Sequence, residues 1–587
     1  MSPQTSGARA IADYDFSPLL PQPGDTSVPH LDKTLGRLRD GARRFAQLSI
    51  DERIALARSM QRGYVKVAER SVAAGCKAKG ITPGTPLEAE EWATGPLGIV
   101  RQLRLIRESL ESIRDTGNTR VGKVQRGQDG RLSVQVFPAS PIDGMLFKDV
   151  RVDVRMQHGV SEEDLGASRA RFYKKRTHEG RVVMVLGAGN VAAIPAMDVI
   201  TKMFNEGKVC ILKMHPVNAY IGPFIEEAFK EAIDRDFLAV VYGGIDVGEF
   251  LTRHAGVDEI HITGSDKTYN AIVWGPAGPE QAERIGKGNP VCNKAITAEL
   301  GNVSPVIIVP GPYTDKELAF QAEDLAGAFS CNAAFICCAP VVVITQWNWT
   351  QRDAFFGHVE RVLQSLPPRR AYYPGAGERW TKYTRGRTGM KTCGTATKGG
   401  TTWALLRNLQ GTDASEPIFR NEPFCSVLAE VVIDATDPAG FLEQAVTFAN
   451  TRLWGTLTAN LIVHPKTVKD GKLKDRVERA IVDLHYGTVT VNSSFNGMSF
   501  VFGTPPWGAW PGSTATDIQS GTGWVHNTPM LENIEKVVAR FPLTAFPKPV
   551  YFPSHKTAHI LMRKLVALEE TGGWMRVPAV VFAAARG

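Results

Sequence analysis

The sequence predicts an α/β protein in which short buried strands alternate with helices. From Arg181 onward, short apolar runs are separated by segments with helical spacing. A second unit of the same type begins near 306–309 and continues through 341–344. This alternation is typical of parallel sheets whose crossover helices cover both faces. The strands of the first unit are expected at 182–186, 209–212, 238–242 and 259–262.

The segments before residue 181 show other patterns. Residues 31–116 carry apolar side chains at helical spacing, interrupted by Gly and Pro near 80–86, and predict a helical layer. Residues 131–180 contain β-rich runs and predict strands that leave the main body as an arm. Residues 1–30 are rich in Pro, Ser and Gly and are expected to be extended.

Length and composition are those of an ordinary globular protein. The 587 residues are enough for two or three domains, and 43% of them are hydrophobic. The net charge of +8 is small for this length, and the basic residues are scattered, which favours a solvated surface over nucleic-acid binding. We find no apolar run long enough to span a membrane and no signal-peptide pattern. We therefore expect a soluble cytoplasmic protein.

The chain has eight cysteines, and none of them has the spacing of a zinc site. No metal is expected, and such a long chain does not need disulfides, which favours a reducing compartment. An isolated cysteine is more often a buried structural thiol than a nucleophile. A catalytic role therefore has to be argued from the residues that accompany it.

Cys337 is the candidate nucleophile. It follows Asn332 by five residues, and Glu299 lies upstream in a Glu-Leu-Gly sequence. A thiolate attacks carbonyl carbons well, and the thioester that results needs a base to activate water. Asn190, which follows the first strand, adds an amide. Thiol, carboxylate and amide together suffice to form and hydrolyse a thioester.

Other candidate residues follow predicted strands. Lys213 ends the second strand, and Gly264 and Ser265 follow a later one, where a helix N-terminus would offer N–H groups to a phosphate. The alternatives are a surface lysine at Lys213 and a helix N-cap at Ser265, and the N-cap is compatible with phosphate binding. Glu422 and Phe424 come after the cysteine.

Taken in this order, the motifs resemble those of the NAD(P)-dependent aldehyde dehydrogenase superfamily. The intervals from Asn190 to Lys213 and from Asn332 to Cys337 match the family pattern, and the resemblance covers about 181–500. It implies a Rossmann-type cofactor domain, an α/β catalytic domain and a β oligomerisation arm. The expected boundaries are 1–130 and 181–298 for the helical layer and cofactor domain, 299–500 for the catalytic domain, and 131–180 and 536–587 for the arm and a C-terminal extension.

The resemblance also implies residue roles. Cys337 would attack the aldehyde, with the Asn190 amide and the Cys337 N–H holding the oxyanion. Hydride transfer to the cofactor would leave a thioester, and Glu299 would activate water to release the acid. Lys213 would bind the adenosine ribose. The neighbouring Cys338 is the alternative nucleophile, and the spacing from Asn332 favours Cys337. The remaining cofactor contacts would come from Gly264 and Ser265 at the pyrophosphate, and from Glu422 and Phe424 at the nicotinamide ribose.

The chain also departs from the family pattern. Ala334 and Phe335 stand where Gly-Gln is usual, which would place a ring beside the expected substrate entrance. The stretch between Ser265 and Glu299 is longer than usual, and an added loop is expected there. Pro216 replaces the glutamate with which NAD-preferring relatives bind the ribose. Without that carboxylate, a 2′-phosphate would meet no repulsion, so NAD or NADP is expected, with NADP accepted.

Three functions remain open. The first is a hydrolytic aldehyde dehydrogenase. The second is an acyl-CoA or acyl-phosphate reductase on the same scaffold, which would not need Glu299 to activate water. The third is a catalytically silent scaffold, which the presence of the whole residue set disfavours.

We expect a homodimer or homotetramer, because strand arms tend to pair, and a small aldehyde as substrate. A last strand is expected around 541–552 and a helix near 559–568, and the apolar end at 577–582 could cover a neighbouring subunit.

Overall fold

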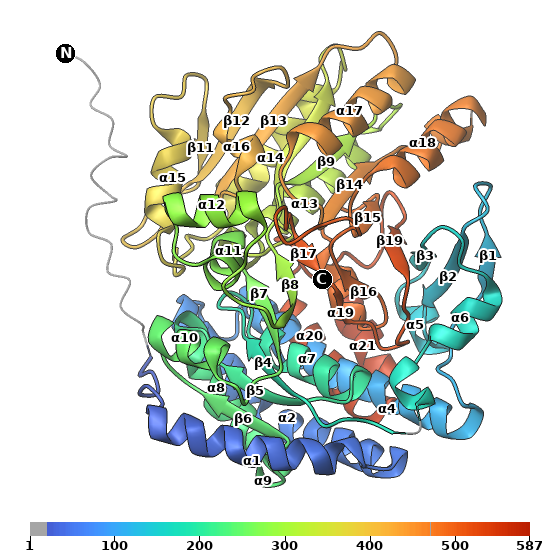
Figure 1. Ribbon diagram of the computed structural model, residues 1–587. Helices are drawn as coiled ribbons and strands as arrows, with labels where there is room; N and C mark the ends of the chain where they lie inside the picture. The colour runs from blue at the N-terminus through green and yellow to red at the C-terminus, as the bar shows by residue number, and fades with distance from the viewer. Residues whose placement is uncertain (1–19, 176, 470) are drawn as a thin grey trace.

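The computed structural model describes residues 20–175, 177–469 and 471–587. Its framework is one sheet of six strands and one of eleven, with helices packed around both (Figure 1). The predicted α/β class with parallel-rich sheets is confirmed. Residues 1–19 of the expected extended segment lie outside the described residues. Residues 20–27 are the described part of that segment before the first helix, and they contain no helix or strand.

The six-stranded sheet has the order β17-β8-β7-β4-β5-β6. Neighbours from β8 to β6 are parallel, and β17 is antiparallel to β8. Every residue of β5 is buried, as expected for a parallel strand covered on both faces. The strands are β4 Val182–Leu186, β5 Val209–Lys213, β6 Leu238–Val241, β7 Glu259–Gly264, β8 Ala295–Leu300 and β17 Gly521–Thr522.

The predicted helical layer packs against this sheet. α1 contacts β5 and β6, and α2 contacts α4 and α8. The ends of α2 are set locally, since Ser49 and Glu52 form a capping box at its start and Gly80 is left-handed (φ 67°) at its end. The helices of this part are α1 Val28–Ala46, α2 Ile50–Lys79, α3 Ala89–Trp92, α4 Gly98–Thr116, α7 Ile194–Ile200, α8 Gly222–Ala228, α9 Lys230–Asp234 and α10 Ile245–Arg253.

The eleven-stranded sheet has a parallel centre in which β14, β9, β10 and β13 are neighbours. Each of these strands is buried along its whole length. The strands on this side are β9 Ser304–Ile308, β10 Pro340–Gln346, β11 Lys391–Cys393, β12 Trp403–Gln410, β13 Val427–Ile433, β14 Thr458–Ile462 and β15 Thr488–Val491. The helices are α13 Asp315–Ser330, α14 Arg352–Ser365, α15 Ala376–Thr384, α16 Pro417–Arg420, α17 Pro438–Arg452, α18 Gly471–Asp483 and α19 Gly497–Phe502.

The expected arm is a continuation of the same sheet. Its antiparallel strands β1 to β3 join the sheet through β19, which pairs antiparallel with β3 and parallel with β15. β19 connects these strands to the centre of the sheet, so the expected arm is built on the main sheet and is not separate from it (Figure 1, right). The elements are β1 Val124–Arg126, β2 Leu132–Phe137, α5 Pro141–Leu146, β3 Arg151–Met156, α6 Glu162–Ser168 and β19 Ile534–Arg540.

Two further expectations need correction. The last strand is β19, and residues 541–552 form a loop that is rich in proline, which cannot donate to a strand ladder. The insert between Ser265 and Glu299 contains two helices, α11 Asp266–Trp274 and α12 Pro279–Lys287, and not a loop alone. The C-terminal helix is confirmed as α20 Ala558–Thr571, and a second one follows, α21 Val577–Ala585.

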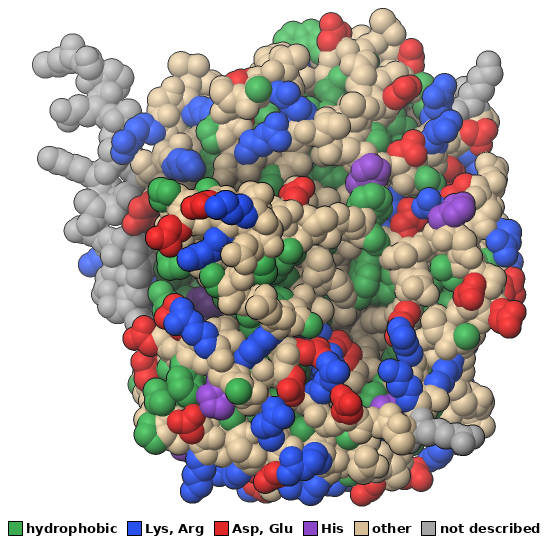
Figure 2. All heavy atoms as spheres, viewed as in Figure 1, with side chains coloured by type: hydrophobic (Ala, Val, Ile, Leu, Met, Phe, Trp, Pro, Cys, Tyr) green, Lys and Arg blue, Asp and Glu red, His purple; other side chains and the backbone are tan. Residues whose placement is uncertain are grey.

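The surface carries both signs of charge. On the face in Figure 2, Lys and Arg side chains are interspersed with Asp and Glu rather than gathered in one patch. Among the described residues, no helix combines the length and the apolar character needed to cross a membrane. On α21, Val577 and Val580 are buried against the chain's own core, while Val581 and Phe582 are exposed.

Candidate active site

Three of the predicted site residues lie at the carboxyl ends of parallel strands in the six-stranded sheet. Asn190 follows β4, Lys213 is the last residue of β5, and Ser265 follows β7. β4 is the neighbour of both β5 and β7, so the three positions meet at one sheet edge. Crevices at such edges are where open α/β sheets bind their ligands.

Lys213 and Ser265 differ in their surroundings. Lys213 is buried, and burial lowers the pKa of its ammonium group while the nearby charge of Asp25 opposes that shift. Ser265 is exposed and caps α11, because its Oγ accepts a hydrogen bond from the Thr268 N–H at 3.2 Å. Gly264, just before it, is exposed as well. The N-terminus of α11 is thus open to solvent.

Glu299 and Cys337 come together from the two sheets. Glu299 lies on β8, opposite Thr263 of β7 and Gly521 of β17. Cys337 lies on the turn that precedes β10. The Cys337 thiol and the Trp507 indole lie near the Glu299 carboxylate and partly oppose the rise in its pKa. The sheets therefore bring the predicted nucleophile and the predicted base close together.

The environment shifts both groups toward their neutral forms. Burial, together with the nearby charge of Asp198, raises the pKa of Glu299 to about 8. A hydrogen bond with Cys338, burial and the charge of Glu299 raise the pKa of the Cys337 thiol well above its usual range. The thiol needs a proton acceptor to become a nucleophile, and Glu299 is in position to accept that proton.

The geometry distinguishes Cys337 from Cys338. Cys337 is half-buried, lines a cavity and lies near Glu299. Cys338 is buried, with 1% of its surface exposed, and acts as a hydrogen-bond partner of Cys337. The position near the carboxylate favours Cys337.

Asn190 fixes the loop that carries the cysteine. Its Nδ2 donates to the Phe335 carbonyl oxygen at 3.0 Å, two residues before Cys337. Asn332 Nδ2 donates to the same oxygen at 2.8 Å and to the Asn190 carbonyl oxygen at 2.9 Å. A side-chain amide has two N–H donors, so Asn190 keeps one for a ligand after binding the loop.

The cysteine loop has an unusual backbone. Asn332, Ala333 and Ala334 are all left-handed, with φ of 52°, 56° and 67°. Each such residue other than glycine costs about 1–3 kcal/mol and persists only where its surroundings enforce it. The strain occurs where the family pattern has glycine at position 334.

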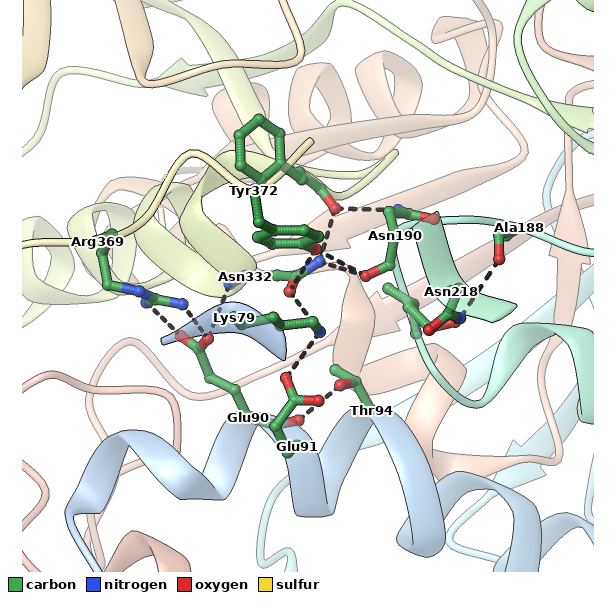
Figure 3. A network of polar contacts seen from close by, with 12 residues as sticks. Lys79, Glu90, Glu91, Thr94, Ala188, Asn190, Asn218, Asn332, Arg369 and Tyr372 are labelled. Carbon is green, nitrogen blue, oxygen red and sulfur yellow. Dashed lines mark hydrogen bonds and ion pairs between the residues drawn. The ribbon is translucent and has the colours of Figure 1, made fainter. Parts of the chain in front are cut away.

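A buried polar network supports this strained turn (Figure 3). Lys79 Nζ donates to Asn332 Oδ1 at 2.9 Å and pairs with Glu91 at 2.7 Å. Tyr372 Oη donates to Asn332 Oδ1 and to the Asn190 carbonyl oxygen. These residues come from distant parts of the chain, and no local motif marks them, so sequence reasoning missed them.

Glu422 and Phe424 occupy different positions. The Glu422 carboxylate packs on Gly301, where an added methyl group would lie 2.0 Å from its Oε2. Phe424 joins a ring cluster with Phe335 and Tyr373, at centroid distances of 5.7 and 4.9 Å. Phe335 is thus buried among rings, and the expectation that it lies beside the substrate entrance is wrong.

A cavity of about 830 Å³ opens beside the nucleophile. Cys337, Phe495 and Trp507 line its inner end. Among the described residues, no group of three or more His, Cys, Asp or Glu side chains is arranged to hold a metal ion. The site is therefore a thiol on the wall of a mainly apolar cavity, with the Glu299 carboxylate buried near it.

The comparisons with known proteins concern the fold that carries this site. Residues 165–367 match the model of the aldehyde dehydrogenase family. A salicylaldehyde dehydrogenase from Pseudomonas putida G7, solved with salicylaldehyde, superposes with a TM-score of 0.58, covering 89% of this chain and 92% of that chain at 13% identity. The fold is that of the aldehyde dehydrogenases. The resemblance predicted from the motifs is confirmed.

Two further relatives show the extent of the similarity. An NADP-dependent glyceraldehyde-3-phosphate dehydrogenase from Bacillus halodurans C-125, solved with NADP, shares this aldehyde dehydrogenase fold with a TM-score of 0.59 and 16% identity, over 87% of this chain and 91% of that chain. The aldehyde dehydrogenase LUC3 of a Fusarium species is 28% identical over 155 residues, which is 26% of this chain and 30% of that protein. The chain thus spans about a third of the length of the curated relatives it matches.

Proposed function

We propose that the protein oxidises an aldehyde to a carboxylic acid with NAD or NADP. The observation that carries the proposal is the placement of the Cys337 thiol near the buried Glu299 carboxylate, so that each affects the pKa of the other. A nucleophile close to a base, on the wall of a cavity, is the arrangement that acyl transfer through a thioester requires. The aldehyde dehydrogenase fold supports the same reaction class.

The proposed reaction has two halves. Cys337 Sγ attacks the aldehyde carbon as Glu299 accepts the thiol proton, and the negative charge develops on the former carbonyl oxygen. The second N–H of Asn190 and the Cys337 backbone N–H are the donors for that oxygen, and one such donor is typically worth about 2.7–4 kcal/mol. A dinucleotide held at the carboxyl edge of the six-stranded sheet would supply the hydride acceptor for the same carbon, which leaves a thioester on Cys337. Once Glu299 has released the thiol proton to solvent, it takes a proton from water, which attacks the thioester and releases the acid and the Cys337 thiolate. The proton on Glu299 then returns to that thiolate.

The cofactor contacts are assigned by the same proposal. Lys213 would bind the adenosine ribose, Gly264 and Ser265 the pyrophosphate at the N-terminus of α11, and Glu422 with Phe424 the nicotinamide side. The corresponding domains are 1–130 with 181–298 for the cofactor, and 299–500 for catalysis. The segments 131–180 and 536–587 would form the oligomerisation arm and the C-terminal extension.

Assembly and location follow as proposals. The strand β1 ends the eleven-stranded sheet, and among residues 20–175, 177–469 and 471–587 no further strand pairs with its outer side. Exposed strand edges tend to find partners, so we expect a homodimer or homotetramer that pairs through the arm. None of the eight cysteines forms a disulfide bond, which is compatible with a cytoplasmic enzyme.

The acyl-CoA or acyl-phosphate reductase is the second candidate. In that reaction a thiol or phosphate, and not water, releases the acyl group. Glu299 disfavours this alternative, since a buried carboxylate beside the acyl-bearing sulfur is suited to activate water. A silent scaffold is disfavoured because it would not need the thiol and the carboxylate close together.

Product analysis separates these candidates. We expect purified protein with an aldehyde panel and NAD or NADP to form one carboxylic acid for each reduced cofactor, without coenzyme A or phosphate. Chromatography of the product and absorbance of the reduced cofactor measure both quantities. Product that forms only when coenzyme A or phosphate is added would support the reductase instead.

A further inference from the structure

The cavity at Cys337 continues well beyond the catalytic residues. Its far wall is formed by the loop 541–557 and by the two C-terminal helices, which lie after β19. This wall is mainly apolar. Its members on the helices are Ala558, Leu561, Met562 and Leu565 of α20, and Val580 and Ala584 of α21.

The buried charges on the wall already have partners. Asp324 accepts hydrogen bonds from Tyr551 Oη at 2.5 Å and from Ser493 Oγ at 3.3 Å. Glu90 forms an ion pair with Arg369 at 2.6 Å. A polar substrate would lose water beside Asp324, Glu90 and Arg369 without gaining an ionic partner from them. An apolar chain would gain from leaving water.

The C-terminal helices are firmly attached, so the wall is preformed. The carboxylate of Glu569 near the end of α20 pairs with Arg101 at 2.5 Å and with Arg104 at 2.7 Å, and all three side chains are buried. Removing one member of such a buried ionic group is strongly destabilising. On the other side, Thr557 Oγ1 donates to the Ala583 carbonyl oxygen at 2.7 Å, which ties α21 to the start of α20.

We propose that the C-terminal extension closes an apolar tunnel that selects long-chain aliphatic aldehydes. The proposal rests on the proposed function and names the substrate class of the same site. The volume of about 830 Å³ lies in the upper part of the range of about 300–1,000 Å³ that ligand pockets span. Each methylene buried in the tunnel should raise kcat/KM about fourfold, which corresponds to about 0.8 kcal/mol.

Neighbouring alanines on α21 provide a matched test. Ala584 lines the tunnel, and Ala585 is exposed. Because both lie in the last helix, Ala584→Trp and Ala585→Trp should fold alike. We expect wild type to prefer decanal to propanal by at least a hundredfold in kcat/KM. Ala584→Trp should lower the value for decanal at least tenfold and change propanal less than twofold, while Ala585→Trp should change neither.

A binding measurement tests the tunnel independently of the oxidation reaction. Calorimetric titration with decanoate should show binding to wild type and to Ala585→Trp, and at least tenfold weaker binding to Ala584→Trp. Acid production with a preference for propanal would overturn the tunnel and leave the proposed function standing. Decanoate binding without oxidation of any aldehyde would overturn the proposed function and leave the tunnel as a binding site. Equal effects of the two tryptophans would overturn the tunnel.

A second, independent observation concerns the cofactor. The N-terminal segment pairs with the chain just after β6, where the Thr26 N–H donates to the Tyr242 carbonyl oxygen and the Tyr242 N–H donates to Thr26 Oγ1, both at 3.0 Å. This pairing brings Asp25 next to Gly243, where an added methyl group would lie 3.6 Å from the Asp25 Cγ. The Asp25 carboxylate thus lies at the sheet edge that ends in Lys213, and its charge acts on that lysine.

His215 does not supply the positive charge that a 2′-phosphate would need. Burial and the charge of Lys213 lower the pKa of His215 to about 4, so its ring is neutral near pH 7. Its Nδ1 accepts a hydrogen bond from the Val217 N–H at 3.2 Å. Lys213 therefore faces a carboxylate from the N-terminal segment and a neutral ring.

We infer that Asp25 replaces the carboxylate missing at Pro216 and makes the site prefer NAD to NADP. Its oxygens would accept hydrogen bonds from the ribose hydroxyls and repel a 2′-phosphate. This inference also rests on the proposed function, and it reverses the cofactor expectation drawn from Pro216 alone. A charge supplied by a segment about 190 residues away in the sequence is invisible to local motif reading.

Direct titrations with NAD and NADP test the inference without turnover. We expect wild type to bind NAD more tightly, and Asp25→Asn to tighten NADP at least fivefold while weakening NAD. Asp246→Asn is the control, since Asp246 is exposed at the start of the neighbouring α10, and it should change each Kd less than twofold. Tighter NADP binding by wild type, or equal effects of Asp25→Asn on both dinucleotides, would overturn the role of Asp25. If neither NAD nor NADP binds to wild type, the proposed function is overturned as well.

Discussion

Cys337→Ala is expected to abolish aldehyde oxidation, lowering kcat by at least about a thousandfold, whereas Cys338→Ala retains most of the activity. The reason is the position of the Cys337 thiol near the Glu299 carboxylate. Cys338 acts on Cys337 and not on that carboxylate. Without the thiol of Cys337, no thiohemiacetal forms, and there is no activated carbon from which hydride can be transferred. Steady-state absorbance of the reduced cofactor measures the effect.

The two cysteine variants control for each other. Cys338 is the more deeply buried of the pair, so loss of packing should destabilise Cys338→Ala more than Cys337→Ala. Thermal unfolding and NAD binding identify any variant that fails to fold. Loss of activity in folded Cys338→Ala, with activity retained in Cys337→Ala, would contradict the assignment.

Glu299→Gln is expected to separate the two halves of the reaction. The amide cannot accept a proton from water, so hydrolysis of the thioester should slow by about 10²–10⁴-fold. Hydride transfer precedes that step, so one equivalent of reduced cofactor per active site should still appear before the steady rate. This first phase should be slower than in wild type, because the amide cannot accept the thiol proton either. Stopped-flow absorbance measures the first phase and the steady rate that follows. A reaction with no faster first phase would contradict the assignment of thioester hydrolysis to Glu299.

The pH profile of wild type adds a second measure of the same residue. Glu299 acts as a base only when ionised, and its pKa is raised to about 8. Steady-state kcat should therefore rise as pH increases through about 8 and level off above it. The residual steady rate of Glu299→Gln should lack this rise, and a rise retained in the variant would assign the titration to another group.

The main elements could be predicted because their signals are local. β4 was expected at 182–186 and is found at Val182–Leu186, since an apolar run bounded by glycine is readable without context. Helix α12 in the insert was missed because none of its residues is buried, so no apolar face marks it. The arm was expected to leave the main body, but its pairing with β19 joins segments that are far apart in the sequence.

The same contrast holds for the site. Asn190, Lys213, Glu299 and Cys337 could be selected from their order and spacing, because a fixed fold keeps such intervals. The surroundings of these residues could not be predicted from the sequence, because they depend on packing between distant segments. Lys79 holds Asn332 from α2, and Asp25 acts on Lys213 from the N-terminal segment. Phe335 was expected at the substrate entrance, but its ring is buried and packs against the rings of Phe424 and Tyr373.

The central claim is that the acyl group is carried on Cys337 and released by Glu299. Peptide mass spectrometry of Glu299→Gln, quenched after reaction with an aldehyde and NAD, tests it most directly. The account predicts that the peptide containing Cys337 gains the mass of the aldehyde less two hydrogen atoms, and that fragmentation assigns the gain to Cys337. An acyl group on Cys338, or reduced cofactor formed with both cysteines unmodified, would contradict it.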